Sequence, residues 1–369
     1  MKYYIIAGEA SGDLHGSNLI RALKKEDPNA NIRCWGGDLM EEAGGTLARH
    51  YKEMAFMGFL EVLLNLGTIL KNIRFCKEDI TKFSPDVIIF IDFSGFNLRI
   101  AQWAKTQNFT TNYYISPQVW ASRAGRVEKI KRDIDHMYVI LPFETEFYAQ
   151  KGMEVTFVGH PLLDAMENRP EISSESFREA HGLDPKKPVI ALLPGSRKQE
   201  VSRMLAIMLQ TSADYPQYQF VVAGAPGLDA SFYKEILKDS NVTLIRNKTY
   251  ELLSISEAAL VTSGTATLET ALIGIPQVVC YKGNWLSYQI AKRLITLNYI
   301  SLVNLIMGKE VVEELIQSDL TPNNLSESLR KILSGPEREQ QIKDYQELKE
   351  KLGGPGASRK TARLILEKM

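Results

Sequence analysis

The sequence predicts an α/β protein made of two Rossmann-like domains in tandem that face a central cleft. Short apolar runs alternate with helical patterns, and their near-continuous apolarity is typical of parallel strands buried on both faces. A stretch rich in proline, serine and charge at 161–188 interrupts this pattern, which then restarts. Each half opens with a strand that runs into a glycine-bearing loop, AGEASGD in the first and LPGSRKQE in the second. A chain of 369 residues is long enough for two separate cores.

The predicted elements follow one another in the same order in both halves. In the first half we expect strands at 3–7, 86–92, 110–116, 136–142 and 155–159. In the second half we expect strands at 189–194, 219–224, 242–246, 258–263 and 277–282. Helical segments separate these strands. Near the end of the chain, the pattern predicts a helix at 337–352, a breaker at 353–356 and a last amphipathic helix at 357–369.

The bulk composition excludes several classes of protein. Lysine plus arginine and aspartate plus glutamate both number 44, so the net charge is zero, unlike the basic excess of a dedicated nucleic-acid binder. The three cysteines are widely spaced without a C-x-x-C pair, which argues against a disulfide framework or zinc site and favours the cytoplasm. The first apolar run is too short for a signal peptide, and no run reaches the roughly 18 residues of a membrane span.

The loop GEASGDLHG at 8–16 follows the first predicted strand. It is neither a Walker A loop nor a G-x-G-x-x-G fingerprint, because its glycines are four residues apart. Its place at the carboxyl end of a parallel strand is where open α/β sheets bind ligands, and glycine there lets the backbone come close to one. The alternative is a tight turn in which Asp13 or Ser11 caps the next helix.

Two turns of the second half predict an anion site. LPGSR places Arg197 at a helix N-terminus, where backbone amides and a guanidinium would clamp a phosphate. The stretch 262–279 ends a strand in Ser263, Gly264 and Thr265 and begins a helix at once, so amides and hydroxyls would cradle a diphosphate. Glu269, one turn later, is placed to bind ribose hydroxyls. The alternatives are a loop with a surface arginine and a capped helix with an exposed glutamate.

Asp92 ends the buried strand DVIIFID and is a candidate general base, because a buried acid is costly unless it is paired or used. The alternative is an aspartate that accepts loop amides. The other candidates for this role are Glu9, Asp13, His15 and His160.

Two surface stretches bear on membrane contact. The segment 54–75 is unusually apolar and predicts either a buried helix or a helix exposed to acyl chains. The basic run 123–132 beside Trp120 predicts either a solvated helix face or a surface for anionic head groups. Asp133 and Asp135 form a D-x-D at a helix-to-strand junction, which is the wrong place for a nucleotide metal, and no other metal-ligand spacing occurs.

Several motifs together resemble one family. The motifs GEASGDLHG, SPQVWAS, LPFE, VGHPLLD, LPGSR, SGTATLE and SLVNLIMGKEVVEELIQ occur in the order of the lipid-A-disaccharide synthases, glycosyltransferases of the GT-B fold. The resemblance spans nearly the whole chain. It implies an acceptor and catalytic domain at 1–165, onto which the helix 355–369 crosses back, and a UDP-sugar domain at 186–350.

The resemblance also implies the reaction and its partners. UDP-2,3-diacylglucosamine would transfer its sugar with inversion to 2,3-diacylglucosamine 1-phosphate, which gives a β-1,6-linked disaccharide 1-phosphate and UDP. No metal and no cofactor are expected. The enzyme would be cytoplasmic and peripheral on the inner face of the inner membrane, and it would bind no nucleic acid. A homodimer with exchanged C-terminal segments is also implied, in which GGPG at 353–356 is the hinge; the alternative is that 353–356 is merely a turn.

The resemblance gives the candidate residues their roles. Asp92 would deprotonate the acceptor 6-hydroxyl, with Asp13 or His15 to assist or position. The donor would be held by Arg197, Ser263, Gly264, Thr265, Glu269, Tyr281, Asn304 and Glu310. The acceptor and its acyl chains would contact Gly8, Glu9, Ser11, Met57, Phe59, Leu60 and Trp120.

Other functions remain as alternatives. They are a UDP-sugar transferase with another lipid-linked acceptor and a UDP-sugar epimerase of the same fold, which the apolar segment 54–75 disfavours. A nicotinamide-dependent oxidoreductase is disfavoured by the missing G-x-G-x-x-G. A non-catalytic lipid-binding protein would leave the glycine-bearing loops of both halves unexplained.

Overall fold

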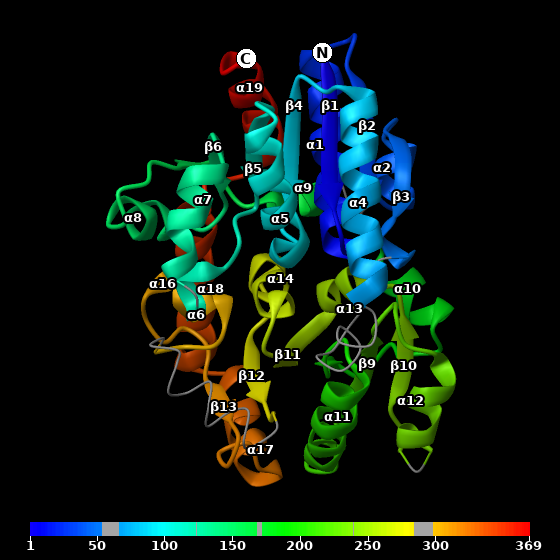
Figure 1. The fold of residues 1–369 in the computed structure, drawn as a ribbon. Helices are drawn as coiled ribbons and strands as arrows, with labels where there is room; N and C mark the ends of the chain where they lie inside the picture. The colour runs from blue at the N-terminus through cyan, green and yellow to red at the C-terminus, as the bar shows by residue number, and fades with distance from the viewer. Residues whose placement is uncertain (54–65, 123, 168–171, 239, 284–297) are drawn as a thin grey trace. The chain divides into compact units, whose positions relative to one another are not determined.

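The protein folds into two compact units, each built on one parallel sheet (Figure 1). Unit 1 comprises Met1–Arg169 and Leu352–Met369, and unit 2 comprises Pro170–Lys351. The predicted α/β class with two Rossmann-like domains is confirmed. The computed structural model describes residues 1–53, 66–122, 124–167, 172–238, 240–283 and 298–369.

Unit 1 contains a seven-stranded sheet in the order β3-β2-β1-β4-β5-β6-β7, in which every neighbouring pair is parallel. Its strands are β1 (Lys2–Ala7), β2 (Asn31–Gly36), β3 (Thr46–His50), β4 (Val87–Ile91), β5 (Thr110–Tyr114), β6 (His136–Val139) and β7 (Thr156–Phe157). Its helices are α1 (Ala10–Glu26), α2 (Asp38–Glu42), α4 (Leu66–Phe83), α5 (Ser94–Thr106), α6 (Val119–Ser122), α7 (Val127–Asp133), α8 (Glu144–Ala149), α9 (Pro161–Glu167) and α19 (Ala357–Glu367), with 3₁₀ turns η1 (Tyr51–Glu53) and η2 (Ala124–Arg126).

Unit 2 contains a six-stranded parallel sheet in the order β10-β9-β8-β11-β12-β13. Its strands are β8 (Val189–Leu193), β9 (Gln219–Gly224), β10 (Thr243–Arg246), β11 (Ser256–Thr262), β12 (Gln277–Tyr281) and β13 (Glu314–Ile316). Its helices are α10 (Ser174–Ala180), α11 (Lys198–Ser212), α12 (Ala230–Leu237), α13 (Thr249–Ser254), α14 (Thr265–Ile273), α16 (Leu302–Met307), α17 (Pro322–Leu333) and α18 (Pro336–Lys351).

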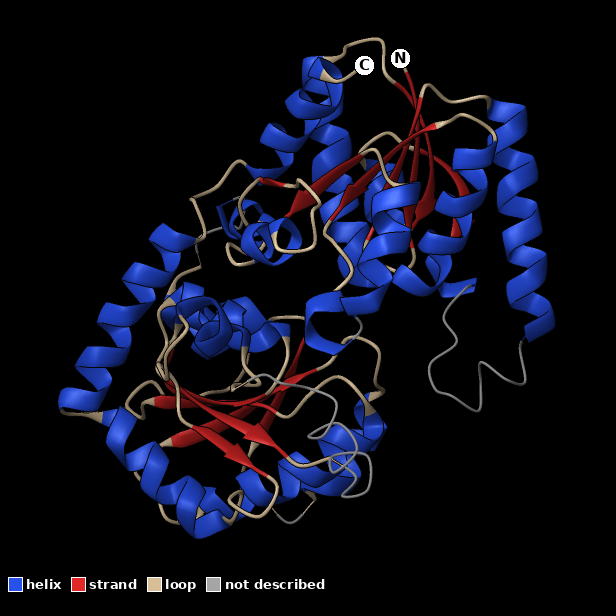
Figure 2. Cartoon of the chain, turned by 60° about the vertical axis from the view of Figure 1, so that its left-hand side comes forward, coloured by secondary structure: helices blue, strands red, loops and turns tan. Residues whose placement is uncertain are grey.

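Helices cover both faces of each sheet (Figure 2). Along β1 of unit 1, Tyr4 and Ile6 enter one core cluster, while Tyr3 and Ile5 enter another on the opposite face. In unit 2, β8 divides its side chains in the same way, since alternate residues of a strand point to opposite faces. The near-continuous apolarity of these strands therefore reflects burial on both faces.

The helix α19 completes unit 1 by packing against α1, as the crossing back of the C-terminal helix predicts. Asp164 in α9 holds its N-terminus, because the two carboxylate oxygens accept the backbone amides of Gly356, Ala357 and Ser358. Arg359 and Arg363 also pair with Glu26 at 3.1 Å each.

All ten predicted strands are present, while β2, β3 and β13 were missed. β2 and β3 carry polar residues among their apolar ones, and β13 has only three residues. Most of the apolar segment 54–75 lies outside the described residues, but its end forms the first part of α4, where Leu70 is 64% exposed. No helix among the described residues is both long and apolar enough to cross a lipid bilayer.

Candidate functional site

In unit 1, Asp92 stands at the carboxyl end of the central strand β4 in a strained turn. Asp92 and Phe93 have φ angles of 43° and 48°, in the left-handed region that costs non-glycine residues of order 1–3 kcal/mol each. The turn is held from inside, because the Asp92 carbonyl accepts Asn97 Nδ2 at 2.8 Å and the Tyr113 hydroxyl. A strained residue held by its surroundings is typical of a functional position.

The environment of Asp92 suits proton transfer. Burial, followed by the negative charge of Glu9, raises the pKa of the Asp92 carboxyl to about 6. A base with this pKa is mostly ionised at neutral pH and still takes up a proton readily.

Gly8 lies where the β1–α1 turn meets the β4–α5 turn. A Cβ atom on Gly8 would stand 2.3 Å from the ring of Phe93, so only glycine allows this approach. Glu9 and Ser11, the other predicted acceptor contacts in this loop, are exposed at the start of α1. The loop thus supports the turn of Asp92, and the charge of Glu9 acts on the Asp92 carboxyl.

Asp13 is engaged by the protein itself. Its carboxylate is 3% exposed and accepts the amides of Gly37 at 2.7 Å, Leu39 at 3.2 Å and Met40 at 3.0 Å. These are the first amides of α2 and the residue before it, which a nearby carboxylate stabilises. The Asp13 carboxylate therefore stabilises the start of α2. Of the two roles predicted for Asp13, assisting proton transfer or positioning, these contacts support positioning.

The two histidines of this region are neutral. Burial lowers the pKa of His15 to about 4 and that of His160 to about 3. His160 Nδ1 accepts the amide of Leu162 at 3.2 Å, whereas His15 Nδ1 has no hydrogen-bond partner among the described residues. The Nδ1 atom of His15 is thus a buried, uncharged group.

The predicted lipid contacts are only partly described. Met57, Phe59 and Leu60 lie outside the described residues. Trp120 in α6 is half-buried, and its ring packs edge-on against that of Phe143, with 4.9 Å between the ring centroids.

In unit 2, a pocket of about 280 Å³ lies between the β8–α11 turn and the β11–α14 turn. Two helices begin beside it, and helix N-termini favour an anion. Ser263, Gly264, Thr265 and Glu269 all line it.

Two of the side chains that line this pocket already have partners. Ser263 Oγ donates to the carbonyl of Ile300 at 2.9 Å, and Glu269 accepts the Tyr250 hydroxyl at 2.8 Å. Burial raises the pKa of Glu269. Arg197 is 71% exposed and pairs with Glu200 at 3.4 Å, a surface contact too weak to fix its guanidinium.

Four predicted donor contacts are not among the residues that line the pocket: Arg197, Tyr281, Asn304 and Glu310. The contacts of Asn304 do not fit its predicted role as a donor contact. It is fully buried, its amide nitrogen donates to Val312 and Glu314, and its oxygen accepts the amides of Val311 and Val312. All of its hydrogen-bonding groups are used within the fold, so it supports the loop and does not face a ligand.

Sequence reasoning missed Thr262, which lines the pocket, and Glu314, which fixes a loop that contacts a lining residue. Thr262, the last residue of β11, lines the pocket, is 6% exposed and has a hydroxyl without a hydrogen-bond partner among the described residues. Glu314 accepts the amides of Ile300 and Ser301 at 2.9 Å each and thereby fixes the loop that receives Ser263. The place of Thr262 at a strand end was a usable signal, whereas nothing in the sequence pairs Glu314 with this loop.

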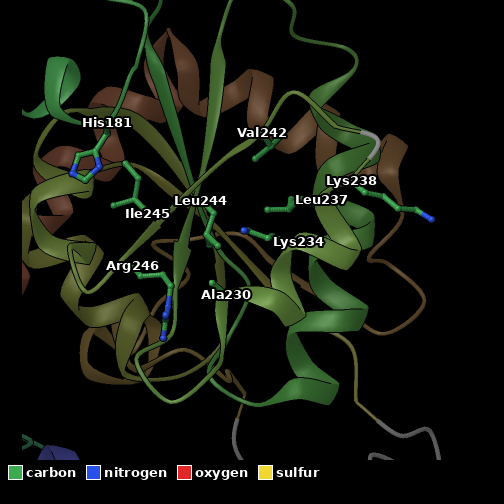
Figure 3. Close-up of a pocket in the computed structure, with 9 residues that line it drawn as sticks. All are labelled: His181, Ala230, Lys234, Leu237, Lys238, Val242, Leu244, Ile245 and Arg246. Carbon is green, nitrogen blue, oxygen red and sulfur yellow. The ribbon is translucent and has the colours of Figure 1, made fainter.

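A second cavity of unit 2, of about 590 Å³, lies along α12 and the strand β10 (Figure 3). Lys234, Lys238 and Arg246 stand around apolar residues such as Leu244. None of the predicted site residues lines it. Among the described residues, no group of three or more His, Cys, Asp or Glu side chains is arranged to hold a metal ion.

The family model described as lipid-A-disaccharide synthetase matches residues 3–368. The chain belongs to the lipid-A-disaccharide synthase family. Lipid-A-disaccharide synthases from Syntrophus aciditrophicus and Geobacter metallireducens are 41% and 39% identical to it, and both alignments cover 98% of this chain and 96% of the relative. The family is that of a glycosyltransferase of lipid A biosynthesis, and the main functional prediction is confirmed at this level.

The comparison with solved structures supports the fold. The UDP-GlcNAc 2-epimerase from Neisseria meningitidis, solved with UDP-GlcNAc bound, has a TM-score of 0.71 at 14% identity, with full coverage of both chains. The glycosyltransferase of kitacinnamycin has a TM-score of 0.69 at 14% identity and covers 100% of this chain and 98% of its own. At this identity the similarity shows the fold alone, an α/β fold with a parallel sheet and its helices in each unit.

Proposed function

We propose that the protein transfers the 2,3-diacylglucosaminyl group of UDP-2,3-diacylglucosamine to O6 of 2,3-diacylglucosamine 1-phosphate. Asp92 would take the proton of the 6-hydroxyl while O6 forms a bond to C1 of the donor. The bond from C1 to the diphosphate oxygen would break with its electron pair, which gives UDP and the β-1,6-linked disaccharide 1-phosphate. The observation that carries the proposal is Asp92, a partly buried acid with a raised pKa in a strained strand-end turn of a family member.

The pocket of unit 2 would hold the leaving UDP. The N-termini of α11 and α14 would stabilise the developing charge of the diphosphate without a metal. Glu269 would bind the ribose, and Arg197 would reach the diphosphate by leaving Glu200, with which its contact is weak. Tyr281 and Glu310 would be outer donor contacts.

Thr262→Val is expected to weaken UDP binding by about 3- to 10-fold, because the variant keeps the shape of the side chain and removes one hydrogen bond to the ligand. Isothermal titration with UDP measures this. Thr262→Ser retains the hydroxyl and should bind UDP as the wild type does. Equal affinities for all three proteins would remove Thr262 from the donor site.

We further infer that the protein acts on the inner face of the inner membrane. Its substrates carry acyl chains, and the exposed Leu70 on α4 continues the apolar segment that begins at residue 54. The acceptor would contact Gly8, Glu9, Ser11 and Trp120, and its chains would contact the apolar segment. The homodimer with exchanged C-terminal segments stays a prediction, which the mass of the purified protein in solution would test.

The reaction is tested by incubating the protein with both substrates in detergent and EDTA and following the products by mass spectrometry. The tetraacyl disaccharide phosphate together with UDP is the expected result. Products that appear only after Mg²⁺ is added would retain the transfer and contradict the metal-independent chemistry. Release of UDP without disaccharide would indicate another lipid-linked acceptor, and a change in the donor sugar alone would indicate an epimerase.

A further inference from the structure

A single buried carboxylate, Glu144, ties together two loops of unit 1. Glu144 begins α8 and is 1% exposed. One of its oxygens accepts the hydroxyl of Ser116, and the other accepts the amides of Ile140 at 3.2 Å and Leu141 at 2.9 Å. Its carboxylate therefore binds its own loop, between β6 and α8, to the loop that follows β5. The proposed reaction gives Glu144 no role of its own, although the indole of Trp120, a proposed acceptor contact, also lies near its carboxylate.

The loop after β5, to which Glu144 binds through Ser116, also hydrogen-bonds to the backbone of Asp92. Ile115 comes directly before Ser116 and has a φ angle of 64°, a left-handed conformation that is rare for a β-branched residue. Its amide donates to the carbonyl of Tyr138 at 3.1 Å, and its carbonyl accepts the amide of Asp92 at 3.3 Å. The backbone of the proposed base thus hydrogen-bonds to a residue whose unfavourable conformation must be imposed by its neighbours.

The chain of contacts is short and continuous. It runs from Glu144 to the side chain of Ser116, along one peptide bond to Ile115, and by one hydrogen bond to Asp92. Pro117 after Ser116 further restricts the loop, because a residue before proline avoids helical backbone angles. A base must lie within hydrogen-bond reach of the proton that it removes, and a displacement of about 1 Å can cost roughly 100-fold in rate.

We propose that Glu144 is a positioning residue for Asp92: through Ser116 it holds Ile115 in the left-handed turn whose carbonyl fixes the Asp92 backbone. This inference rests on the proposed role of Asp92 as the base. The competing explanation is that Glu144 only stabilises the β6–α8 turn through the amides of Ile140 and Leu141.

Ser116→Ala separates the two explanations. The variant removes the link from Glu144 to the Asp92 side and leaves both amide contacts of the β6–α8 turn in place. Ser256→Ala is the matched control, because Ser256 is also buried and its hydroxyl donates to a backbone carbonyl, that of Leu252, in unit 2. Both variants lose one buried hydroxyl contact, but only Ser116 adjoins a residue, Ile115, that hydrogen-bonds to Asp92.

We expect Ser116→Ala and Glu144→Gln to lower kcat by about 10- to 100-fold, with KM for both substrates changed by less than about threefold. The variant Ser116→Ala/Glu144→Gln should lose little more than the worse single variant, because both act through one contact. The acid limb of the kcat profile should also move to lower pH. A loosened loop admits water to Asp92, and the pKa of the Asp92 carboxyl then falls towards its ordinary value. Glu9 and Tyr113, the titratable groups that act on Asp92, are not substituted in these variants.

The inference is overturned if Ser116→Ala matches Ser256→Ala in kcat and in its pH profile while the wild type is active and Asp92→Asn is not. If the wild type forms no disaccharide, or Asp92→Asn stays active, the proposed function or its base assignment has failed instead. Thermal unfolding of each variant identifies losses of kcat that come only from a smaller folded fraction.

Discussion

Asp92→Asn is expected to lower the rate of disaccharide formation by about 10²- to 10⁴-fold, the usual contribution of a positioned general base. The amide of asparagine cannot take up the acceptor proton, and the substitution hardly changes the shape of the side chain. The contacts that hold the turn should survive, because Asn97 and Tyr113 bind the backbone carbonyl of residue 92 and not its side chain. The thermal stability of the variant and its affinity for UDP should therefore match the wild type.

The pH dependence tests the same assignment. Asp92 acts as a base only when ionised, so with a pKa of about 6 the wild-type rate should fall as the pH drops through 6. Glu9→Gln removes the negative charge that helps to raise this pKa, and the acid limb should therefore move to lower pH. An active Asp92→Asn enzyme, or an acid limb that Glu9→Gln leaves in place, would contradict the assignment.

Asp13→Ala is expected to reduce the free energy of unfolding by about 3 kcal/mol or more, because it leaves several buried amides without an acceptor. Chemical denaturation measures this loss. The loop from Gly37 to Met40 would lose the anion that stabilises the start of α2.

Asp13→Asn is the matched variant. Its remaining oxygen can still accept the amides of Gly37 and Met40, which share Oδ1 in the wild type, so most of the stability should be retained. If Asp13 only positions the fold, this variant should also retain most of the turnover. A stable Asp13→Asn protein without activity would instead indicate that Asp13 takes part in the reaction itself.

The sequence predicted the parts of the site that depend on one strand and the turn that follows it. Asp92 and Ser263 to Thr265 could be found because the carboxyl ends of parallel strands are where such sheets bind ligands. The same rule located the glycine of the first loop, although the close approach that Gly8 allows is to the ring of Phe93.

The parts that the sequence did not reveal depend on partners far along the chain. Asp13 looks like a member of a ligand loop until β2 brings the amides of residues 37–40 to it, and β2 itself was missed. Asn304 lies in a motif of the family, and only the folded loop shows that its side chain hydrogen-bonds to Val311, Val312 and Glu314. A polar residue in a motif can serve the ligand or the loop, and the contacts decide between them.

The docking of α19 by Asp164 has a consequence for the order of folding. The whole of unit 2 is synthesised between the two segments of unit 1, so unit 2 is complete before its neighbour is. Until residues 357–367 emerge, the surface of α1 that receives Ala362 and Ile365 stays uncovered, and apolar surface exposed in this way promotes aggregation. Unit 1 therefore stays incomplete while unit 2, nearly half of the chain, is translated. Its last folding step is the packing of α19 against α1, with the N-terminus of α19 bound by Asp164.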